Sequence, residues 1–207
     1  PRADTNPIAH ELLDRFGTIS GVCDAPIEEL TRTKGITQNV AILLKLIPQL
    51  SRHYINTQTS DKERIYDTNS AMRIISPQFI GRKNEMVVLV LMDSKNRVLY
   101  CGVVTEGNVN TVPLYIRKII TLAATYNAAE AIIAHNHPSG NVMPSPGDII
   151  ATRKLNAAME TIDVHLQDHI IFGYPDYLSM KDCGLLAHIL KPENQVIQTE
   201  EAEQYNP

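Results

Sequence analysis

The sequence predicts an α/β sandwich that is preceded by a small all-helical domain. Its 207 residues suffice for one compact domain with a smaller helical domain attached. Apolar residues recur at helical spacing through residues 9–52, whereas strand-like and helical segments alternate from residue 86 onward. We expect a helical domain over residues 1–52, a linker over 53–69, the α/β domain over 70–190 and an acidic, disordered tail over 191–207.

The helical domain is expected to contain three helices. The first carries the apolar residues Leu12 and Phe16, and Pro26 opens the second, because proline suits the first turn of a helix. The third helix follows a turn at Gly35. It should kink or end at Pro48, which cannot donate a helical hydrogen bond.

The α/β domain begins with strand signals. Residues Met86–Met92 are apolar and rich in valine, and Val98–Thr105 follows a short polar turn, so the two segments should form a hairpin. A helical pattern over residues 114–123 then leads to the short apolar strand Ala131–Ala134. A helix over Pro146–Thr161, a strand over Val164–Phe172 and a helix over Lys181–Leu190 are expected to complete the domain.

The composition excludes several classes of protein. The longest apolar runs, Ala41–Ile47 and Met86–Met92, are far shorter than the roughly 20 residues that span a bilayer, so no membrane protein is expected. Three widely spaced cysteines fit neither a disulfide framework nor a CxxC metal site, which favours a cytoplasmic protein. The net charge of -4 gives no overall electrostatic reason for a nucleic-acid partner. No secretion signal is readable, although the start at Pro1 suggests that a segment upstream has been removed.

Residues 131–150, AIIAHNHPSGNVMPSPGDII, contain the side chains that carry chemistry. Because side chains alternate along a strand, His135 and His137 project from one face with about 6–7 Å between their Cα atoms, and can converge on one ion. Pro138 ends the strand, which places the histidines where a substrate can approach. The pair alone is a weak pattern, because solvated histidines at this spacing are common.

Residues further along the chain strengthen the metal hypothesis. Ser145 is expected to cap a helix, with Pro146 at its first position and Asp148 at its third. A capping box would explain Asp148 without any metal. Together with the two histidines, Asp148 supplies a third ligand and leaves a fourth tetrahedral position for water, as catalytic zinc sites do. We therefore expect one zinc ion bound by His135, His137 and Asp148.

The full pattern HxHxxxxxxxSxxD resembles the signature of the JAMM metallopeptidases. The words HNHPSG, PSPGD and DHIIFG more closely resemble the bacterial RadC family, and the resemblance runs from the helical head to about Leu186. It implies the MPN fold, a cytidine-deaminase-like α/β/α sandwich with a mixed sheet. It also implies a zinc-dependent hydrolase that cleaves a peptide, isopeptide or other amide bond of a protein or peptide substrate with metal-activated water.

The resemblance implies catalytic roles as well. Ser145 would stabilise the oxyanion, and a glutamate at the start of a strand would be the general base. Glu85, which directly precedes the strand at residues 86–92, is the candidate, although a charge beside a strand is common. Glu106 and Glu130 are rivals. We expect both to point away from the metal, because Glu106 lies at the far end of its strand and Glu130 precedes the histidine strand.

Other titratable residues are expected to be structural. His165 and His169 are too far apart for one ion, at about 13 Å along a strand. His169 should be buried and hydrogen-bonded, or support the zinc ligands. Cys101 and Cys183 should be packing residues, because no basic surroundings are readable for either thiol.

The helical head resembles the helix-hairpin-helix region that precedes the RadC catalytic domain, through LLDRFGTISGVCDAP, EEL and KGIT. Such modules bind phosphate through a Gly-x-Gly turn at a helix N-terminus. Here Thr37 replaces the second glycine after Gly35, but Thr37 is still a good helix cap. Nucleic-acid binding and a docking or purely structural role of the head both remain open.

Two other classes of function remain open for the whole chain. It could be a non-catalytic, DNA-associated or DNA-repair accessory protein that keeps the fold. It could also be a metal-dependent nuclease or phosphoesterase, since HxH pairs occur in those enzymes. Their barrel forms need about 250 residues, and Ser139 and Gly140 replace the Asp and His of a metallo-β-lactamase-like motif. The substrate and the oligomeric state are not readable from the sequence.

Overall fold

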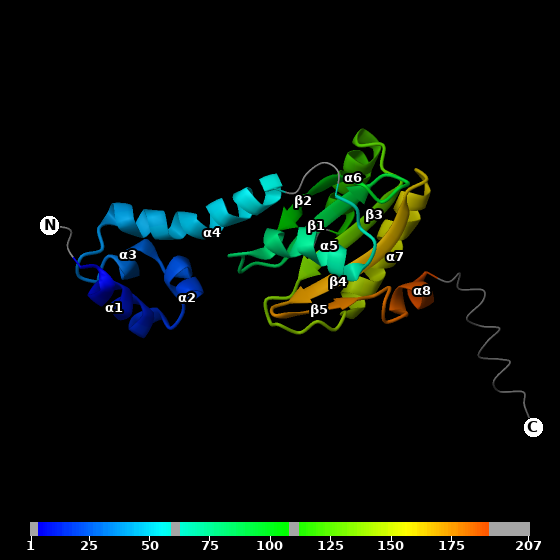
Figure 1. The fold of residues 1–207 in the computed structure, drawn as a ribbon. Coiled ribbons are helices and arrows are strands. Elements are labelled where there is room, and N and C mark those ends of the chain that lie inside the picture. The colour runs from blue at the N-terminus through cyan, green and yellow to red at the C-terminus, as the bar shows by residue number, and fades with distance from the viewer. Residues whose placement is uncertain (1–3, 59–62, 108–111, 191–207) are drawn as a thin grey trace, which may run out of the picture. The chain divides into compact units, whose positions relative to one another are not determined.

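The computed structural model describes residues 4–58, 63–107 and 112–190, and Figure 1 shows the order of their elements. They fall into two compact units. The helical unit comprises Pro1–Thr59 with Phe79–Arg82, and the α/β unit comprises Ser60–Gln78 with Lys83–Pro207. The predicted disordered tail over residues 191–207 lies outside the described residues.

The described part of the helical unit contains four helices, one more than the sequence pattern predicts. They are α1 (Asn6–Phe16), α2 (Ile19–Asp24), α3 (Ile27–Leu30) and α4 (Gln38–Gln58). The additional helix, α2, has 6 residues, which is too short for an apolar period to show. Leu12, Val22, Leu30 and Ala41, from the four helices, share one buried core.

Pro48 does not end helix α4, so of the two outcomes expected from the sequence, a kink or an end, the end is wrong. The helix continues to Gln58, so the segment predicted as a linker over residues 53–69 begins as helix. The proline is held by its surroundings: a β-carbon at Gly81 would lie 2.9 Å from Cβ of Pro48, so glycine allows this close approach. Arg52 also donates a hydrogen bond of 2.9 Å to the carbonyl of Ile80. These contacts offset the helical bond that proline removes.

The turn at Gly35 has a structural explanation. Its φ of 93° lies in the region that favours glycine, and a β-carbon there would lie 2.6 Å from Cδ1 of Ile8. Thr37 accepts a hydrogen bond of 3.4 Å from the backbone N–H of Val40, as expected for a cap of α4. The glycine therefore needs no bound phosphate to explain it.

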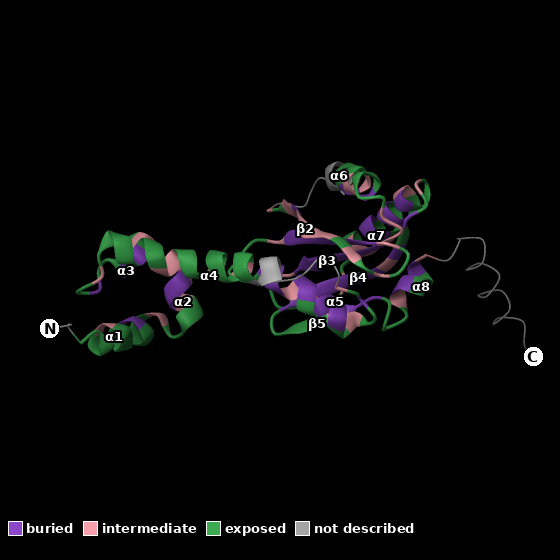
Figure 2. Ribbon diagram, turned by 45° about the horizontal axis from the view of Figure 1, so that its top comes forward, coloured by how far each residue is buried: buried purple, intermediate pink, exposed green. Residues whose placement is uncertain are grey.

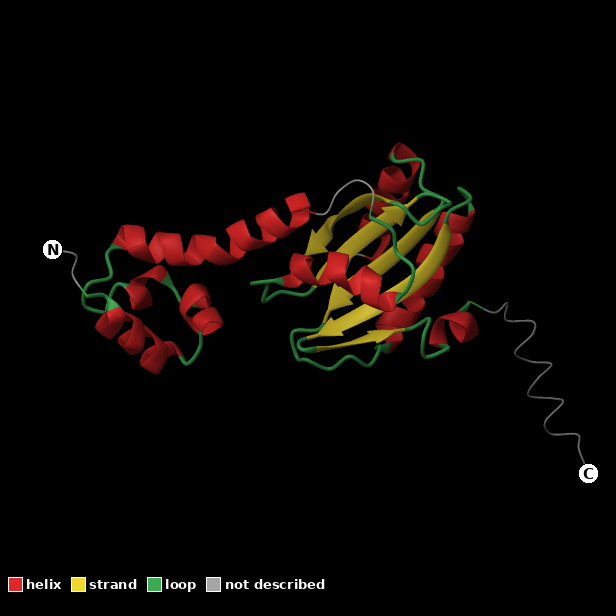
Figure 3. Ribbon diagram, viewed as in Figure 1, coloured by secondary structure: helices red, strands yellow, loops and turns green. Residues whose placement is uncertain are grey.

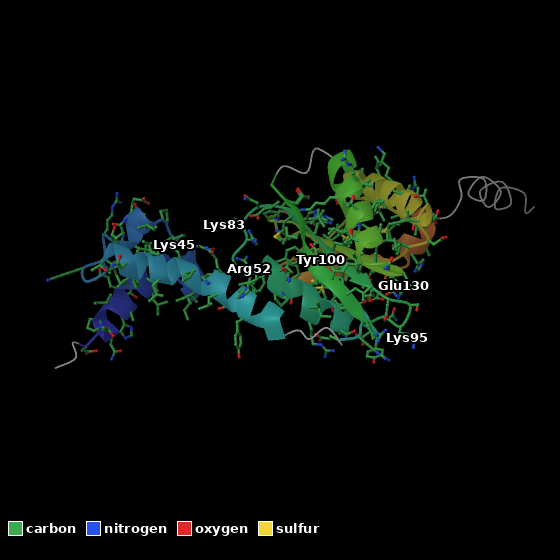
Figure 4. The ribbon with its side chains drawn as sticks, turned by 90° about the horizontal axis from the view of Figure 1, so that it is seen from above. Lys45, Arg52, Lys83, Lys95, Tyr100 and Glu130 are labelled. Atoms are coloured by element: carbon green, nitrogen blue, oxygen red, sulfur yellow. The ribbon has the colours of Figure 1, made fainter. Side chains whose placement is uncertain are left out.

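Lys45 of α4, labelled in Figure 4, caps the end of α2. Its ammonium donates to the carbonyls of Cys23, Asp24 and Ala25 at 3.3, 3.2 and 2.9 Å. The last carbonyls of a helix have no partner within the helix, so a cation is favourable there. One side chain thus joins the short helix to the long one.

The α/β unit is built on a five-stranded sheet of order β2-β1-β3-β4-β5. The strands are β1 (Met86–Met92), β2 (Val98–Glu106), β3 (Glu130–Asn136), β4 (His165–Gly173) and β5 (Asp176–Ser179). Strands β3 and β4 are parallel and the other neighbours are antiparallel, so the predicted mixed sheet is confirmed. The edge strand β5 was not predicted, because its 4 residues are too few to show alternation.

Helices cover both faces of the sheet, as an α/β/α sandwich requires (Figure 3). Helix α5 (Thr68–Ile75) lies on one face, and α6 (Val112–Thr125) and α7 (Pro146–Glu160) lie on the other. The short α8 (Leu185–Ile189) follows β5. No helix among the described residues is both long enough and apolar enough to cross a bilayer.

The central strands are buried on both faces, which explains their continuous apolar runs (Figure 2). Val87, Leu89 and Leu91 of β1 pack with Ile133 of β3 in the core beneath α6 and α7. The side chains between them point to the α5 face, since neighbours along a strand alternate. At the end of the sheet where His135 lies, side chains of β1 and β3 that point to the α7 face are therefore neighbours.

The lysine cap gives a prediction for stability. Replacing Lys45 by methionine should lower the free energy of unfolding of the helical unit by about 1.5–3 kcal/mol, the usual worth of hydrogen bonds from a charged group. Urea unfolding of the full chain measures the loss. Lys34→Met, at an exposed lysine of the same unit, is the control and should change stability by less than about 0.5 kcal/mol. Equal effects of the two variants would contradict a capping role.

Candidate metal centre

The two predicted histidines meet at the end of β3. His135 is the penultimate residue of the strand and is 3% exposed, and the N–H of His137 donates to the carbonyl of Phe172 on β4 at 2.8 Å. Their Nε2 atoms lie 2.9 Å apart. This pair of ring nitrogens defines the centre of the site.

Asp148, in the first turn of α7, completes the predicted set. Its Oδ1 lies 3.2 Å from Nε2 of His135, and its Oδ2 lies 3.5 Å from Nε2 of His137. The N–H and the hydroxyl of Ser145 both donate to Oδ2 at 2.7 Å, and the N–H of Asp148 donates to the Ser145 hydroxyl at 3.2 Å. The capping box and a metal site are therefore not alternatives, because one carboxylate can serve both.

The surroundings of Asp148 keep it ionised. Burial raises the pKa of this carboxyl, but the hydrogen bond and charge of His135, together with the bonds from Ser145, outweigh burial. The net effect holds the pKa of Asp148 well below its usual range. The carboxylate is thus in the form that a metal ion needs.

Glu85 reaches the same point from the neighbouring strand. One of its carboxylate oxygens and the ring nitrogens of His135 and His137 all lie within 4.8 Å of one another. Strand pairing explains this position, because Val87 lies opposite His135 and Glu85 is two residues before Val87, on the same face and across from His137. No described residue donates a hydrogen bond to the Glu85 carboxylate.

The rival glutamates do not reach this point, but the expected reason is wrong for Glu106. It pairs with Met86 and so lies at the same end of the sheet as Glu85. Met86 follows Glu85 in the chain and so points to the opposite face, and Glu106 shares the face of its partner Met86. Glu130 pairs with Met92 at the opposite end, near the turn that carries Lys95 (Figure 4).

The donor atoms fit a divalent cation. Nδ1 of His137 donates to the carbonyl of Asn141 at 2.6 Å, which leaves the lone pair on Nε2 directed at His135. Two ring nitrogens at 2.9 Å need a cation or a proton between them. The carboxylates of Asp148 and Glu85 add negative charge around the same point. Nitrogen and oxygen donors of this kind suit zinc.

Sequence reasoning missed Asn136, which holds the strand that carries Glu85. Its side chain is 7% exposed and points to the face opposite His135. The amide oxygen accepts from the N–H of Met86 at 2.9 Å, and the amide nitrogen donates to the carbonyl of Asn84 at 3.1 Å. The two bonds fix the backbone on either side of Glu85. Alternation places Asn136 on that face, but its partners depend on strand pairing that the sequence does not reveal.

Two further residues lie beside the proposed ligands: His169, for which the sequence allowed a supporting role, and Thr152, which the sequence did not single out. His169 of β4 lies with Nε2 2.8 Å from Nδ1 of His135, and Thr152 of α7 lies with its hydroxyl 2.6 Å from Nδ1 of His169. Burial above all, together with the charge of His135, lowers the pKa of His169 to about 3. His169 is therefore neutral, which confirms a buried, hydrogen-bonded histidine.

The remaining titratable residues lie elsewhere. Nδ1 of His165 lies 2.8 Å from a carboxylate oxygen of Glu130, and Asp168 accepts from the hydroxyl of Ser179 at 2.5 Å. Burial raises the pKa of Cys101 to about 12, so this thiol is not a nucleophile at neutral pH. Cys183 is exposed, and its thiol lies 3.5 Å from the carbonyl of Met180.

A sheet covered on both faces, with two histidines and two carboxylates at one end, matches a known class of domain. The model of the RadC-like JAB domain family matches residues 65–185. The chain therefore belongs to this family. It is similar to the UPF0758 protein IL0240 of Idiomarina loihiensis, with 33% identity over 183 residues, 88% of this chain and 82% of that protein. A UPF0758 protein of Actinobacillus pleuropneumoniae serotype 5b is 30% identical over 175 residues, 84% of this chain and 80% of that protein.

The clamp at Asn136 can be tested through stability. Asn136→Ala leaves the N–H of Met86 buried without its acceptor, so the free energy of unfolding of the α/β unit should fall by about 1–3 kcal/mol. Thermal unfolding with calorimetry measures this loss. Asn69→Ala removes one exposed hydrogen bond, from the Tyr177 hydroxyl at 2.9 Å, and should cost less. A smaller loss for Asn136→Ala than for Asn69→Ala would argue against the clamp.

Proposed function

We propose that this chain is a zinc-dependent hydrolase that cleaves a peptide, isopeptide or other amide bond. One observation carries the proposal: the Nε2 atoms of His135 and His137 meet at 2.9 Å between the carboxylates of Asp148 and Glu85. The four residues come from β3 and its end, from the first turn of α7 and from the residue before β1. Membership of the RadC-like JAB domain family supports a hydrolase.

Three of these residues would hold the metal. His135 and His137 offer ring nitrogens and Asp148 offers Oδ1, a set that leaves one tetrahedral position for water. When bound, zinc supplies a Lewis acid that lowers the pKa of such a water to about 7 and polarises a carbonyl. Asp148 keeps its place because Ser145 binds the other carboxylate oxygen.

Glu85 would move the proton. Its carboxylate lies beside the ligand nitrogens and takes no hydrogen bond from any described residue, so it is free to accept a proton from the attacking water. The same carboxyl can then donate this proton to the leaving amine, which is a poor leaving group without it. Asn136 keeps the backbone around Glu85 in position for both steps.

Ser145 would stabilise the developing oxyanion. In the structure its hydroxyl hydrogen is directed to Oδ2 of Asp148 at 2.7 Å. Donation to a substrate therefore requires rotation of the hydroxyl, after which the N–H of Ser145 alone retains Oδ2. The hydroxyl oxygen of Ser145 stays in place because it accepts from the N–H of Asp148. This role is worth about a hundredfold or more in rate for a typical oxyanion donor.

Metal analysis tests the ligand set. Protein purified without chelator should carry about one zinc ion per chain by mass spectrometry, and Asp148→Ala or His135→Asn should lose most of it, because each removes a ligand. His165→Asn, at the opposite end of the sheet, is the matched control and should keep zinc. A parent protein without zinc, or full occupancy in Asp148→Ala, would show that the ligand set is wrong.

The catalytic step needs a separate test, because a site can bind zinc without hydrolysis. A pool of peptides and lysine-linked isopeptides, followed by release of amines, is the probe. Glu85→Gln should keep its zinc but slow hydrolysis about 10²–10⁴-fold, the usual worth of a general base. Glu106→Gln, on the other face of the sheet, should behave as the parent. An unchanged rate in Glu85→Gln would transfer the base to another residue.

A further inference from the structure

A buried chain of hydrogen bonds connects helix α7 to the ring of His135. The Thr152 hydroxyl lies 2.6 Å from the carbonyl of Asp148 and 2.6 Å from Nδ1 of His169. Nε2 of His169 lies 2.8 Å from Nδ1 of His135. Thr152 and His169 are 0% and 4% exposed, so water does not compete for these bonds.

The protons in this chain can be assigned one by one. A carbonyl only accepts, so the single hydroxyl hydrogen of Thr152 goes to Asp148. The hydroxyl oxygen must then accept from His169, which places the proton of His169 on Nδ1. The His169 ring is 4% exposed and its ring nitrogens bond to Thr152 and His135, with no carboxylate as a partner, so burial favours the neutral ring with one proton. Its Nε2 therefore accepts. The bond to His135 therefore needs the proton on Nδ1 of His135.

We propose that Thr152 and His169 are positioning residues that set the tautomer of His135, so that its Nε2 lone pair faces the metal. The inference rests on the metal binding proposed above, and it explains the orientation of one ligand by two residues that do not themselves bind the metal. His137 reaches the same state by a shorter route, through the carbonyl of Asn141. Both rings then direct Nε2 at the proposed metal position, and a cation there would replace the proton that the two nitrogens, 2.9 Å apart, share without it.

The chain also ties two of the proposed ligands together. The backbone carbonyl of Asp148 accepts the first hydrogen bond, and the ring of His135 donates the last one. The parallel pairing of β3 with β4 makes this possible, since His169 lies opposite Ile133, two residues before His135 on the same face. The arrangement fixes the distance between helix α7 and the strand as well as the position of the proton.

Two substitutions of Thr152 separate the effect of its hydroxyl group from the effect of its side-chain shape. In Thr152→Val the Nδ1 proton of His169 has no acceptor, so it can move to Nε2. His169 then donates to Nδ1 of His135, whose own proton must occupy Nε2 and block the metal. Zinc affinity, measured by competition with a chromogenic chelator, should fall about 10–100-fold, as is usual when a group that orients a metal ligand is lost. Thr152→Ser restores the hydroxyl and should bind zinc almost as the parent does.

A matched control removes the same kind of backbone bond elsewhere. The hydroxyl of Thr125 donates to the carbonyl of Thr121 at 2.7 Å in helix α6, on an exposed surface. Thr125→Val should leave zinc affinity unchanged. Equal affinities of the parent and Thr152→Val would overturn the inference, as would a loss that Thr152→Ser fails to restore.

Nitrogen-15 NMR of labelled histidines provides a readout that needs no zinc. The ring of His169 should carry its proton on Nδ1 in the parent, and the proton should move to Nε2 in Thr152→Val. A parent His169 that is protonated on Nε2 would overturn the inference by itself. If the parent binds no zinc, the proposed function fails, and the tautomer of His169 still decides the inference.

Discussion

The pairing of β1 with β3 is the constraint on which the site depends. Val87 lies opposite His135, so Glu85 falls across from His137 on the same face of the sheet. A shift of this pairing by one residue would turn Glu85 to the α5 face, because side chains alternate along a strand. Burial of both strands resists such a shift, since it would expose or misplace every apolar side chain of β1. The core beneath α6 and α7 therefore fixes the geometry of the proposed chemistry.

The start of helix α7 adds a second constraint. Ser145 and Asp148 form a capping box that would stabilise a helix in any protein. In this chain the same box holds Oδ2 of the carboxylate and leaves Oδ1 directed at His135. Local helix chemistry thus sets the orientation of a side chain whose other oxygen faces the centre of the site. The burial of Thr152 one turn further along links this helix to the interior.

Much of the fold and part of the site could be predicted from the sequence. Met86–Met92 is a continuous apolar run, Ala131–Ala134 is short but wholly apolar, and the cap at Ser145 is a local pattern, so the structure confirms all three. Short elements such as β5 carry too few residues for a period to show. The partners of Asn136 and His169 come from strands or helices that are distant in the sequence. Such contacts depend on pairing and register, which a single sequence does not specify.

If Asp148 binds a metal as proposed, its double use would link metal occupancy to folding. Any ion that binds the folded site and not the unfolded chain stabilises the fold, by about 2.7 kcal/mol at a hundred times its dissociation constant. Part of that free energy acts on the first turn of α7, because Asp148 and Ser145 belong to its cap. Loss of the ion would leave the carboxylates of Asp148 and Glu85 near the histidine pair without the cation that balances their charge. The first turn of this helix is then the part of the α/β unit whose order responds most directly to the supply of metal.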